Sequence, residues 1–162
     1  MTNEPIVSDE LVKKCSKLSS ASLHEAGGKI GALPASIKPL APHLKVCGRA
    51  YPVHSPPGDN LFLHHAIYAA QKGDILVVDC GEGVDYGYWG DIMASAAQIQ
   101  GLGGLVISGG IRDSQQMIEM GFPVCSGAIA IRGTGKNPDA DGDIGKPIKI
   151  GNVKIKKGDL VF

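Results

Sequence analysis

An alternation of apolar strands and helices between residues 61 and 131 constrains the fold of this chain most strongly. The predicted strands are 74–79, 105–108 and 124–131. The predicted helices are 61 to 73, capped by Asp59 or Asn60, 91 to 101, and 114 to 120. The first two strands are too apolar to leave a face in water. Strands of this kind joined by helices form parallel βαβ units, so an α/β fold is predicted.

The two ends of the chain have a different character. Ser8 is expected to cap a helix that continues to about Leu18, and a shorter helix follows Ser19 and ends at Gly27-Gly28. Residues 37–53 are rich in proline and β-branched side chains and predict extended chain and strand. The tail from 147 to 162 consists of short β runs separated by glycine turns, which predicts a small C-terminal β layer.

Composition excludes several classes of protein. The 162 residues, 43% of them hydrophobic, suit one compact domain. Sixteen basic residues balance sixteen acidic ones, so neither nucleic acid nor a membrane is an expected partner. The N-terminus lacks a signal-peptide pattern, no apolar run approaches the ~20 residues of a membrane span, and the four cysteines lack metal-site spacing. A cytoplasmic protein with reduced thiols is predicted.

Two polar clusters interrupt this apolar sequence. The first is Tyr88-Trp89-Gly90-Asp91, which is expected to open a helix, and the second is Gly109-Gly110-Ile111-Arg112-Asp113, directly after a strand. In parallel sheets, ligands bind beyond the carboxyl ends of the strands, where loops and helix N-termini meet. Both clusters are therefore candidates for one ligand site.

The residue types in these clusters suit a 2-oxo acid and a metal ion. The first turn at Asp91, Ile92 and Met93 would offer free N–H groups, and Arg112 a two-pronged donor for a carboxylate. Asp113 is a hard oxygen ligand of the kind that Mg²⁺ uses. An Arg-Asp pair in a loop is more often a solvated ion pair, but the adjacent glycines favour close approach to a ligand.

Several motifs taken together resemble the RraA-like superfamily. They are Gly73 to Asp79, Trp89-Gly90-Asp91, Gly101-x-Gly-Gly, Gly110-Ile111-Arg112-Asp113, Phe122-Pro123-Val124, Ile37 to Leu40 and Gly48-Arg49-Ala50. The resemblance covers most of the chain and implies that residues 1–162 form a single RraA-like domain, a β/β/α swivelling-type fold. Members usually continue past Gly158-Asp159 into another β segment and often a helix, and this sequence ends before that extension.

The superfamily includes class II 4-hydroxy-4-methyl-2-oxoglutarate/4-carboxy-4-hydroxy-2-oxoadipate aldolases, which also decarboxylate oxaloacetate. The resemblance implies that Arg112 binds the pyruvate carboxylate, that Asp113 holds the divalent metal, and that Gly90, Asp91, Ile92 and Met93 line the substrate. The alternative is a non-catalytic RraA-type regulator of an endoribonuclease. Such regulators lack the acid after the arginine, so Asp113 favours the enzyme.

The expected reaction is a metal-dependent retro-aldol cleavage of a 4-hydroxy-2-oxo acid, which releases pyruvate. Mg²⁺, or Mn²⁺ or another divalent ion, would neutralise the enolate charge as a Lewis acid. Arg112 and Asp91 are the predicted catalytic residues, with Asp91 handling a proton directly or through water. Neither cluster contains a lysine, which disfavours a Schiff-base mechanism.

Three further expectations concern the surroundings of the site. Family resemblance implies a homotrimer or hexamer with the site between subunits, and Glu25 is an additional candidate that a neighbouring subunit would supply. The alternative for Glu25 is a solvated residue at the end of a short helix. The distal group of the substrate would be read by a loop such as 82–88 or by that neighbour. His64 and His65 are adjacent on a helix, point about 100° apart and cannot chelate one ion; one is expected to be buried and hydrogen-bonded, the other exposed.

Overall fold

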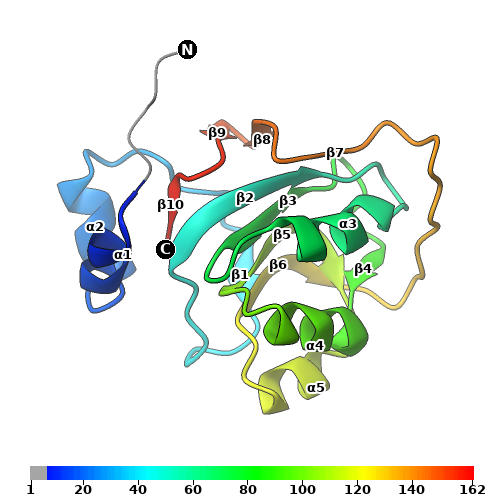
Figure 1. The fold of residues 1–162 in the computed structure, drawn as a ribbon, viewed down its shortest axis with the longest axis horizontal. Helices are drawn as coiled ribbons and strands as arrows, with labels where there is room; N and C mark the ends of the chain where they lie inside the picture. Colours follow the sequence, from blue (N-terminus) through cyan, green and yellow to red (C-terminus); the bar gives the residue numbers. More distant parts are fainter. Residues whose placement is uncertain (1–6) are drawn as a thin grey trace.

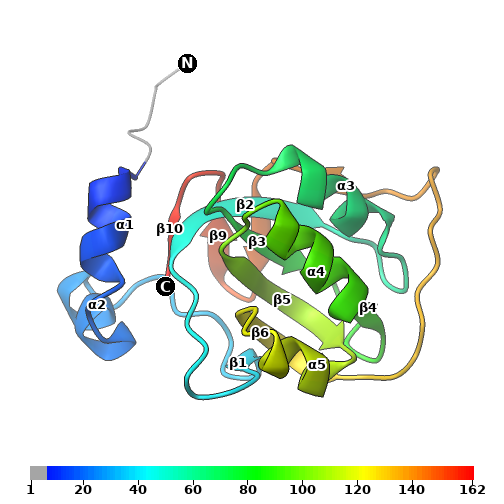
Figure 2. The same cartoon turned by 60° about the horizontal axis from the view of Figure 1, so that its bottom comes forward.

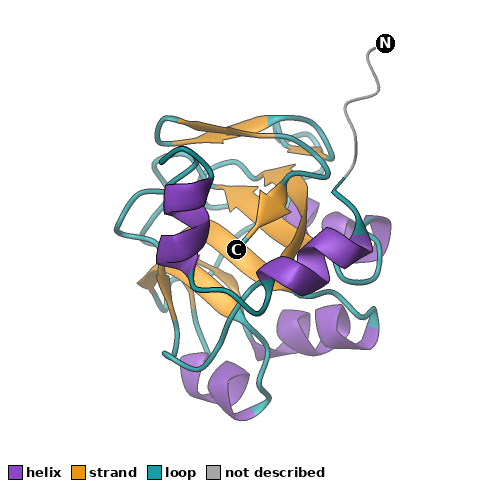
Figure 3. Cartoon of the chain, turned by 90° about the vertical axis from the view of Figure 1, so that its left-hand side faces the viewer, coloured by secondary structure: helices purple, strands orange, loops and turns teal. Residues whose placement is uncertain are grey.

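The computed structural model describes residues 7–162 and has three layers, with a central sheet between helices and a small second sheet (Figures 1 and 3). The central sheet runs β1-β6-β5-β3-β2-β10, with β4 on β5 and β7 on β2. Its strands are β1 (Lys38–Pro39), β2 (Gly48–His54), β3 (Ile75–Asp79), β4 (Gly87–Trp89), β5 (Gly104–Ile111), β6 (Val124–Ile129), β7 (Asp143–Ile144) and β10 (Leu160–Val161). The predicted strands β3, β5 and β6 pair in parallel.

Three helices cover one face of this sheet (Figure 2). They are α3 (Leu61–Ala69), α4 (Asp91–Ile99) and α5 (Ser114–Glu119). Their apolar side chains form one core with inward residues of the strands, such as Leu76, Val78 and Leu105, all of them inaccessible to solvent. A helix layer on this face was expected from the βαβ pattern.

The second sheet covers the opposite face. It is the antiparallel hairpin of β8 (Ile148–Ile150) and β9 (Val153–Ile155), which turns at Gly151 with φ of 58°. Its isoleucines pack with Ile75, Val77 and Val106, the alternate residues of the same central strands. The predicted small C-terminal β layer is therefore confirmed, and with it the β/β/α arrangement.

Two short helices lie beside the β2–β10 edge, α1 (Asp9–Cys15) and α2 (Ser20–Ala26) (Figure 1). Ser8 caps α1 by accepting a hydrogen bond from Leu11 N at 3.2 Å, and Ser19 caps α2 in the same way. No helix in the described part of the chain is long and apolar enough to cross a membrane.

Several boundaries differ from the sequence prediction. Helix α1 ends at Cys15 instead of near Leu18, and β6 ends at Ile129 instead of Ile131. Helix α3 ends at Ala69 and not at Gly73, because the backbone of Ala70 is extended. In the turn that follows, the buried Asp74 side chain accepts a hydrogen bond from Gln71 N. Tyr88 and Trp89 do not open a helix; they form β4.

Strand β5 is longer than predicted and contains the glycines assigned to the Arg-Asp loop. It continues to Ile111, with an irregular register against β6 between Ile107 and Gly110. A Cβ at Gly109 would lie only 2.8 Å from the Tyr88 ring. A Cβ at Gly110 would lie only 2.7 Å from the carbonyl oxygen of Tyr86, the residue before β4. The glycines therefore let β4 pair closely with the end of β5.

Candidate active site

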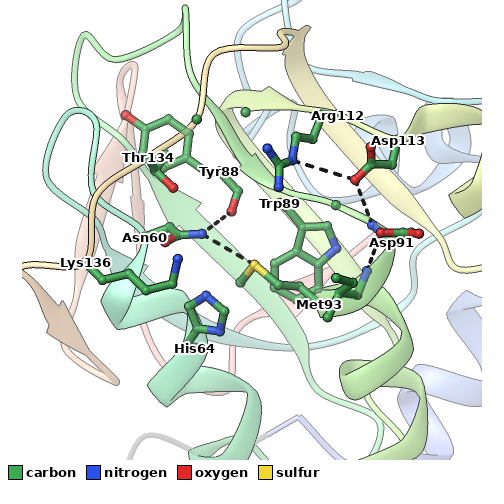
Figure 4. Close-up of a pocket in the computed structure, with 14 residues that line it drawn as sticks. Asn60, His64, Tyr88, Trp89, Asp91, Met93, Arg112, Asp113, Thr134 and Lys136 are labelled. Atoms are coloured by element: carbon green, nitrogen blue, oxygen red, sulfur yellow. Dashed lines mark hydrogen bonds and ion pairs between the residues drawn. The ribbon is translucent and has the colours of Figure 1, made fainter.

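The two polar clusters meet where β4 and β5 end side by side (Figure 4). Trp89 at the end of β4 lies opposite Ile111 at the end of β5, and Arg112 N donates a hydrogen bond to Trp89 O at 2.9 Å. Helix α4 begins at Asp91 and helix α5 just after Asp113. The parallel pairing thus brings together residues that lie 22 positions apart in the sequence.

Asp113 is the centre of this junction. Its Oδ2 lies 3.7 Å from Arg112 Nε and accepts a 3.4 Å hydrogen bond from Asp91 N. Its backbone has φ of 53°, in the left-handed region that residues other than glycine seldom adopt. A non-glycine residue held in this region at a strand–helix junction is typical of functional sites.

Gly90 makes room for the Asp113 carboxylate. Its backbone is extended, so any residue could adopt its conformation. A Cβ at this position, however, would overlap Asp113 Oδ2 and lie 3.5 Å from Arg112 Cγ. The Gly90-Asp91 pair in the sequence therefore reflects close packing against the Arg-Asp pair.

The amides at the start of α4 differ from the expectation. Asp91 N donates to Asp113, and Ile92 N donates to Asp91 Oδ1 at 2.7 Å. Two of the three amides expected to be free are thus occupied by carboxylates in this structure. A substrate carboxylate would compete with these acids for the same donors.

A cavity of about 220 Å³ opens beside the junction. It is lined by all the predicted site residues except Glu25, together with Asn60, His64, Gly87, Tyr88, Trp89, Gly133, Thr134 and Lys136. Trp89 is fully buried and stacks on Phe122 with ring centroids 6.1 Å apart, which fixes this wall. The volume suits a small organic acid.

Unsatisfied polar atoms gather at this cavity. Within residues 7–162, the buried side-chain atoms without a hydrogen-bond partner are Asn60 Oδ1, His64 Nε2 and Trp89 Nε1. All three residues line the cavity. Buried polar groups are nearly always hydrogen-bonded, so three exceptions in one place indicate a site that binds a polar ligand.

The wall opposite Arg112 was missed in the sequence. Figure 4 shows Asn60, His64 and Lys136 together on that side. Asn60 Nδ2 donates to Tyr88 O at 2.8 Å, which holds the side chain beneath β4. The histidine expected to be buried and hydrogen-bonded proves to have a buried Nε2 without a partner. The sequence feature that could have indicated this wall is the spacing of four residues between Asn60 and His64, which places both on one helix face.

Burial and the neighbouring charge lower the pKa of His64. Desolvation is the larger cause, followed by Lys136 and then His65. His64 is therefore predominantly neutral at neutral pH. Among the described residues, Lys136 has neither an ion pair nor a hydrogen bond.

Asp59 fixes the loop that carries Thr134 and Lys136. Its Oδ2 accepts a 2.6 Å hydrogen bond from Asn137 N, and its Oδ1 accepts one from Leu61 N at 2.9 Å. Gly135 N donates to Gly58 O at 2.8 Å, and Gly135 O accepts from Asn60 N at 3.1 Å. On this side the cavity is lined by Gly133, Thr134 and Lys136, whereas of the predicted 82–88 loop it is lined by Gly87 and Tyr88 alone among the described residues.

Glu25 lies away from the cavity. It is on α2, is largely exposed, and pairs with Lys29 at 3.2 Å. Helix α2 stands at the far edge of the sheet from α4 (Figure 2). Within one chain the structure does not bring Glu25 to the site, so its assignment still requires a neighbouring subunit.

The donor set fits a divalent cation held mainly by ligands other than the protein. Groups of three or more histidine, cysteine or acidic residues that could cage a metal do not occur within residues 7–162. Asp113 and Asp91 nevertheless both face the cavity. One or two carboxylates completed by water and substrate oxygens are a usual set for Mg²⁺.

Comparisons with known proteins identify relatives of this chain. A protein of Halalkalibacterium halodurans, provisionally named a 4-hydroxy-4-methyl-2-oxoglutarate aldolase, is 34% identical over 129 residues, which are 80% of this chain and 60% of that protein. The chain thus spans less than two thirds of this relative.

Solved structures share the fold. Streptomyces coelicolor RraAS2, described as an unusual member of the RNase ES inhibitor RraA family, has a TM-score of 0.76 and 26% identity over 94% of this chain and 80% of its own. The RNA-processing inhibitor RraA of Thermus thermophilis has a TM-score of 0.78 at 22% identity, covering 88% of this chain and 85% of its own. The family described as RraA-like, Aldolase/RraA, matches residues 5–162, and the chain belongs to this family.

Proposed function

We propose that this chain is a divalent-metal-dependent lyase that cleaves 4-hydroxy-2-oxo acids to release pyruvate, with oxaloacetate decarboxylation as a side activity. The observation that carries the proposal is the junction of Arg112, Asp113 and Asp91 at a cavity whose lining residues include three with unsatisfied buried polar atoms. The aldolase name of the H. halodurans relative supports the same reaction class.

Arg112 is the proposed carboxylate binder. Its side chain is 49% exposed and faces the cavity, so its guanidinium can contact a ligand. Among residues 7–162, the one other cationic side chain along the cavity is Lys136, on the opposite wall. A planar guanidinium matches the two oxygens of a carboxylate, which orients the 2-oxo acid with its reactive carbon toward Asp91.

Asp113 is the proposed metal ligand, and Asp91 could share the ion. When bound, a divalent ion supplies positive charge beside the 2-oxo group, where negative charge develops as the C3–C4 bond breaks. The Asp113 carboxylate is already oriented for this role, because Arg112 and the Asp91 amide contact its Oδ2.

Asp91 is the proposed proton carrier for C3 of the pyruvate fragment. It stands at the first position of α4, and its Oδ1 is held by Ile92 N. This contact orients the carboxylate at the cavity, where it can pass a proton directly or through a water molecule.

Pyruvate release tests the proposal. A coupled assay with a 4-hydroxy-2-oxo acid and with oxaloacetate should show turnover with Mg²⁺ or Mn²⁺ and none in excess EDTA. Asp113→Asn should lower kcat by about 100-fold, on the order of 3 kcal/mol, because a charged contact to the transition state is lost. Full activity in excess EDTA, or wild-type activity of Asp113→Asn at saturating Mg²⁺, contradicts the mechanism.

The second candidate is a non-catalytic regulator of an endoribonuclease. The fold shared with RraAS2, at 26% identity, favours it. Such a protein would need a docking face but no metal. Absence of turnover with either substrate, together with tight binding to a ribonuclease, would place this candidate first.

A further inference from the structure

The wall of the cavity opposite Arg112 carries a second set of reactive groups, which the proposed roles of Arg112, Asp113 and Asp91 leave unused. This set is the Asn60–His64–Lys136 cluster. Figure 4 shows the Lys136 amine between Asn60 and the His64 ring, across the cavity from Arg112. Asn60 is 5% exposed, and its Oδ1 has no partner among the described residues. The inference below rests on the proposed lyase function.

His64 has the properties of a base for a hydroxyl group. Its Nε2 is buried, faces no hydrogen-bond partner within residues 7–162, and belongs to a cavity-lining side chain. A neutral imidazole with the hydrogen on Nδ1 presents Nε2 as an acceptor. A partnerless acceptor on a side chain that lines a polar cavity favours a ligand that brings its own donor.

Lys136 complements such a base. It is exposed, lacks an ion pair or hydrogen bond among the described residues, and lies close enough to influence His64 electrostatically. An ammonium group beside a hydroxyl stabilises the alkoxide that forms when the proton leaves. The amide oxygen of Asn60 is an acceptor that can hold this ammonium in place.

Retro-aldol cleavage also requires a base at the C4 hydroxyl group. This group is distinct from the carboxylate and 2-oxo group that Arg112 and Asp113 are proposed to bind. The proton of the C4 hydroxyl must leave as the C3–C4 bond breaks. The O–H electron pair becomes part of the new C4 carbonyl, and the C3–C4 pair enters the 2-oxo group to form an enolate. A proton delivered at C3 through Asp91 then completes pyruvate, and the base returns its own proton to water.

We propose that the Asn60–His64–Lys136 cluster binds the C4 oxygen of the substrate, with His64 Nε2 accepting the hydroxyl proton, Lys136 stabilising the oxygen anion, and Asn60 positioning Lys136. With the carboxylate held at Arg112, the substrate spans the cavity from one wall to the other. His64 and Lys136 are catalytic residues for the cleavage, and Asn60 is a positioning residue.

A partial reaction without a hydroxyl group separates this role from the rest of the site. Deuterium exchange at the methyl group of pyruvate, followed by NMR in D₂O with Mg²⁺, needs the enolate but no C4 oxygen. His64→Gln should lower kcat for cleavage by ~100-fold, within the usual range for general-base catalysis. The ratio of cleavage to exchange should fall by a similar factor.

The adjacent, exposed His65 provides the matched control, and His65→Gln should keep the wild-type ratio. Lys136→Met, on an exposed loop position, gives a second measurement if His64→Gln does not fold, and should lower the ratio by about tenfold. An unchanged ratio in both His64→Gln and Lys136→Met, or equal loss of both reactions, overturns the inference. A wild-type chain that neither cleaves nor exchanges contradicts the proposed function itself.

Discussion

At the scale of single residues, the site depends on an interlock between Gly90 and Asp113. The carboxylate of Asp113 occupies the space where a side chain at position 90 would start, and it accepts the next amide along the chain. The backbone of Asp113 is left-handed, with φ of 53°. The missing Cβ at position 90 thus leaves the space that the Asp113 carboxylate fills.

Gly90→Ala should therefore reduce activity more than stability. The new methyl group displaces Asp113 Oδ2 and breaks its contact with Asp91 N, so kcat should fall by about 10-fold or more, as for a lost transition-state contact. Gln100→Ala is the control, because this exposed side chain lies at the far end of helix α4 and does not line the cavity. Steady-state pyruvate release with thermal unfolding measures both effects. Equal activity of the two variants would contradict the interlock.

The buried thiol of Cys80 should make the free energy of unfolding depend on pH in the alkaline range. Burial is the main cause that raises the pKa of this thiol to about 12, from its ordinary value of 9.0. The folded thiol stays protonated while the unfolded thiol ionises, so its stabilising contribution is complete below pH 9 and is lost as the pH rises toward 12. Urea unfolding of wild type and Cys80→Ala should show a smaller alkaline loss in the variant, by at most about 1.4 kcal/mol per pH unit. Parallel pH curves would contradict this account.

At the scale of elements, the sequence pattern predicts the long strands well and the short ones poorly. β3 and β5 are apolar runs whose burial follows from composition alone. β4 and β7 have three and two residues, and they are strands only because β5 and β2 offer edges to pair with. Such pairing is tertiary, so no local pattern encodes it.

The same distinction applies to the site. The Arg112–Asp113 side could be predicted because its residues are contiguous and follow a strand. The Asn60–Lys136 side could not, because it joins a helix start to a loop 76 positions later through the Asp59–Gly135 bridge. The long connection after β6 contains no periodicity that would indicate where it returns to the cavity (Figure 1).

Asp59→Asn tests that loop attachment. The carboxylate accepts two backbone hydrogen bonds, from Leu61 and Asn137, and an amide oxygen with one competing NH₂ group cannot replace both. We expect a loss of about 1–2 kcal/mol in the free energy of unfolding, together with faster amide hydrogen exchange at Asn137. The exposed Asp141→Asn is the control. Unchanged exchange at Asn137 would show that the backbone contacts of Gly135 suffice.

At the scale of the whole molecule, apolar surface remains around the cavity and at the sheet edge. Ile92 at the start of α4 is 80% exposed, and Ile129 and Ile131 after β6 are 67% and 87% exposed. Helix α2 buries none of its residues against the rest of the chain. Large exposed apolar side chains of this kind are typical of a surface that another molecule covers.

We propose that copies of this chain cover these surfaces in a trimer or hexamer, which brings a neighbour's Glu25 toward the Arg112–Asp113 pair. A heterologous contact whose rotation closes after three copies gives such a ring. Light scattering should then give a mass of three or six times 16.8 kDa, and specific activity should fall on dilution below the dissociation constant.

Ile92→Asp should promote dissociation by placing a charge in the covered surface, whereas the same change at the exposed Gln98 should not. If Glu25 acts across the contact, Glu25→Gln should lower kcat without changing the assembly. A monomer with full specific activity would contradict both the ring and the shared site.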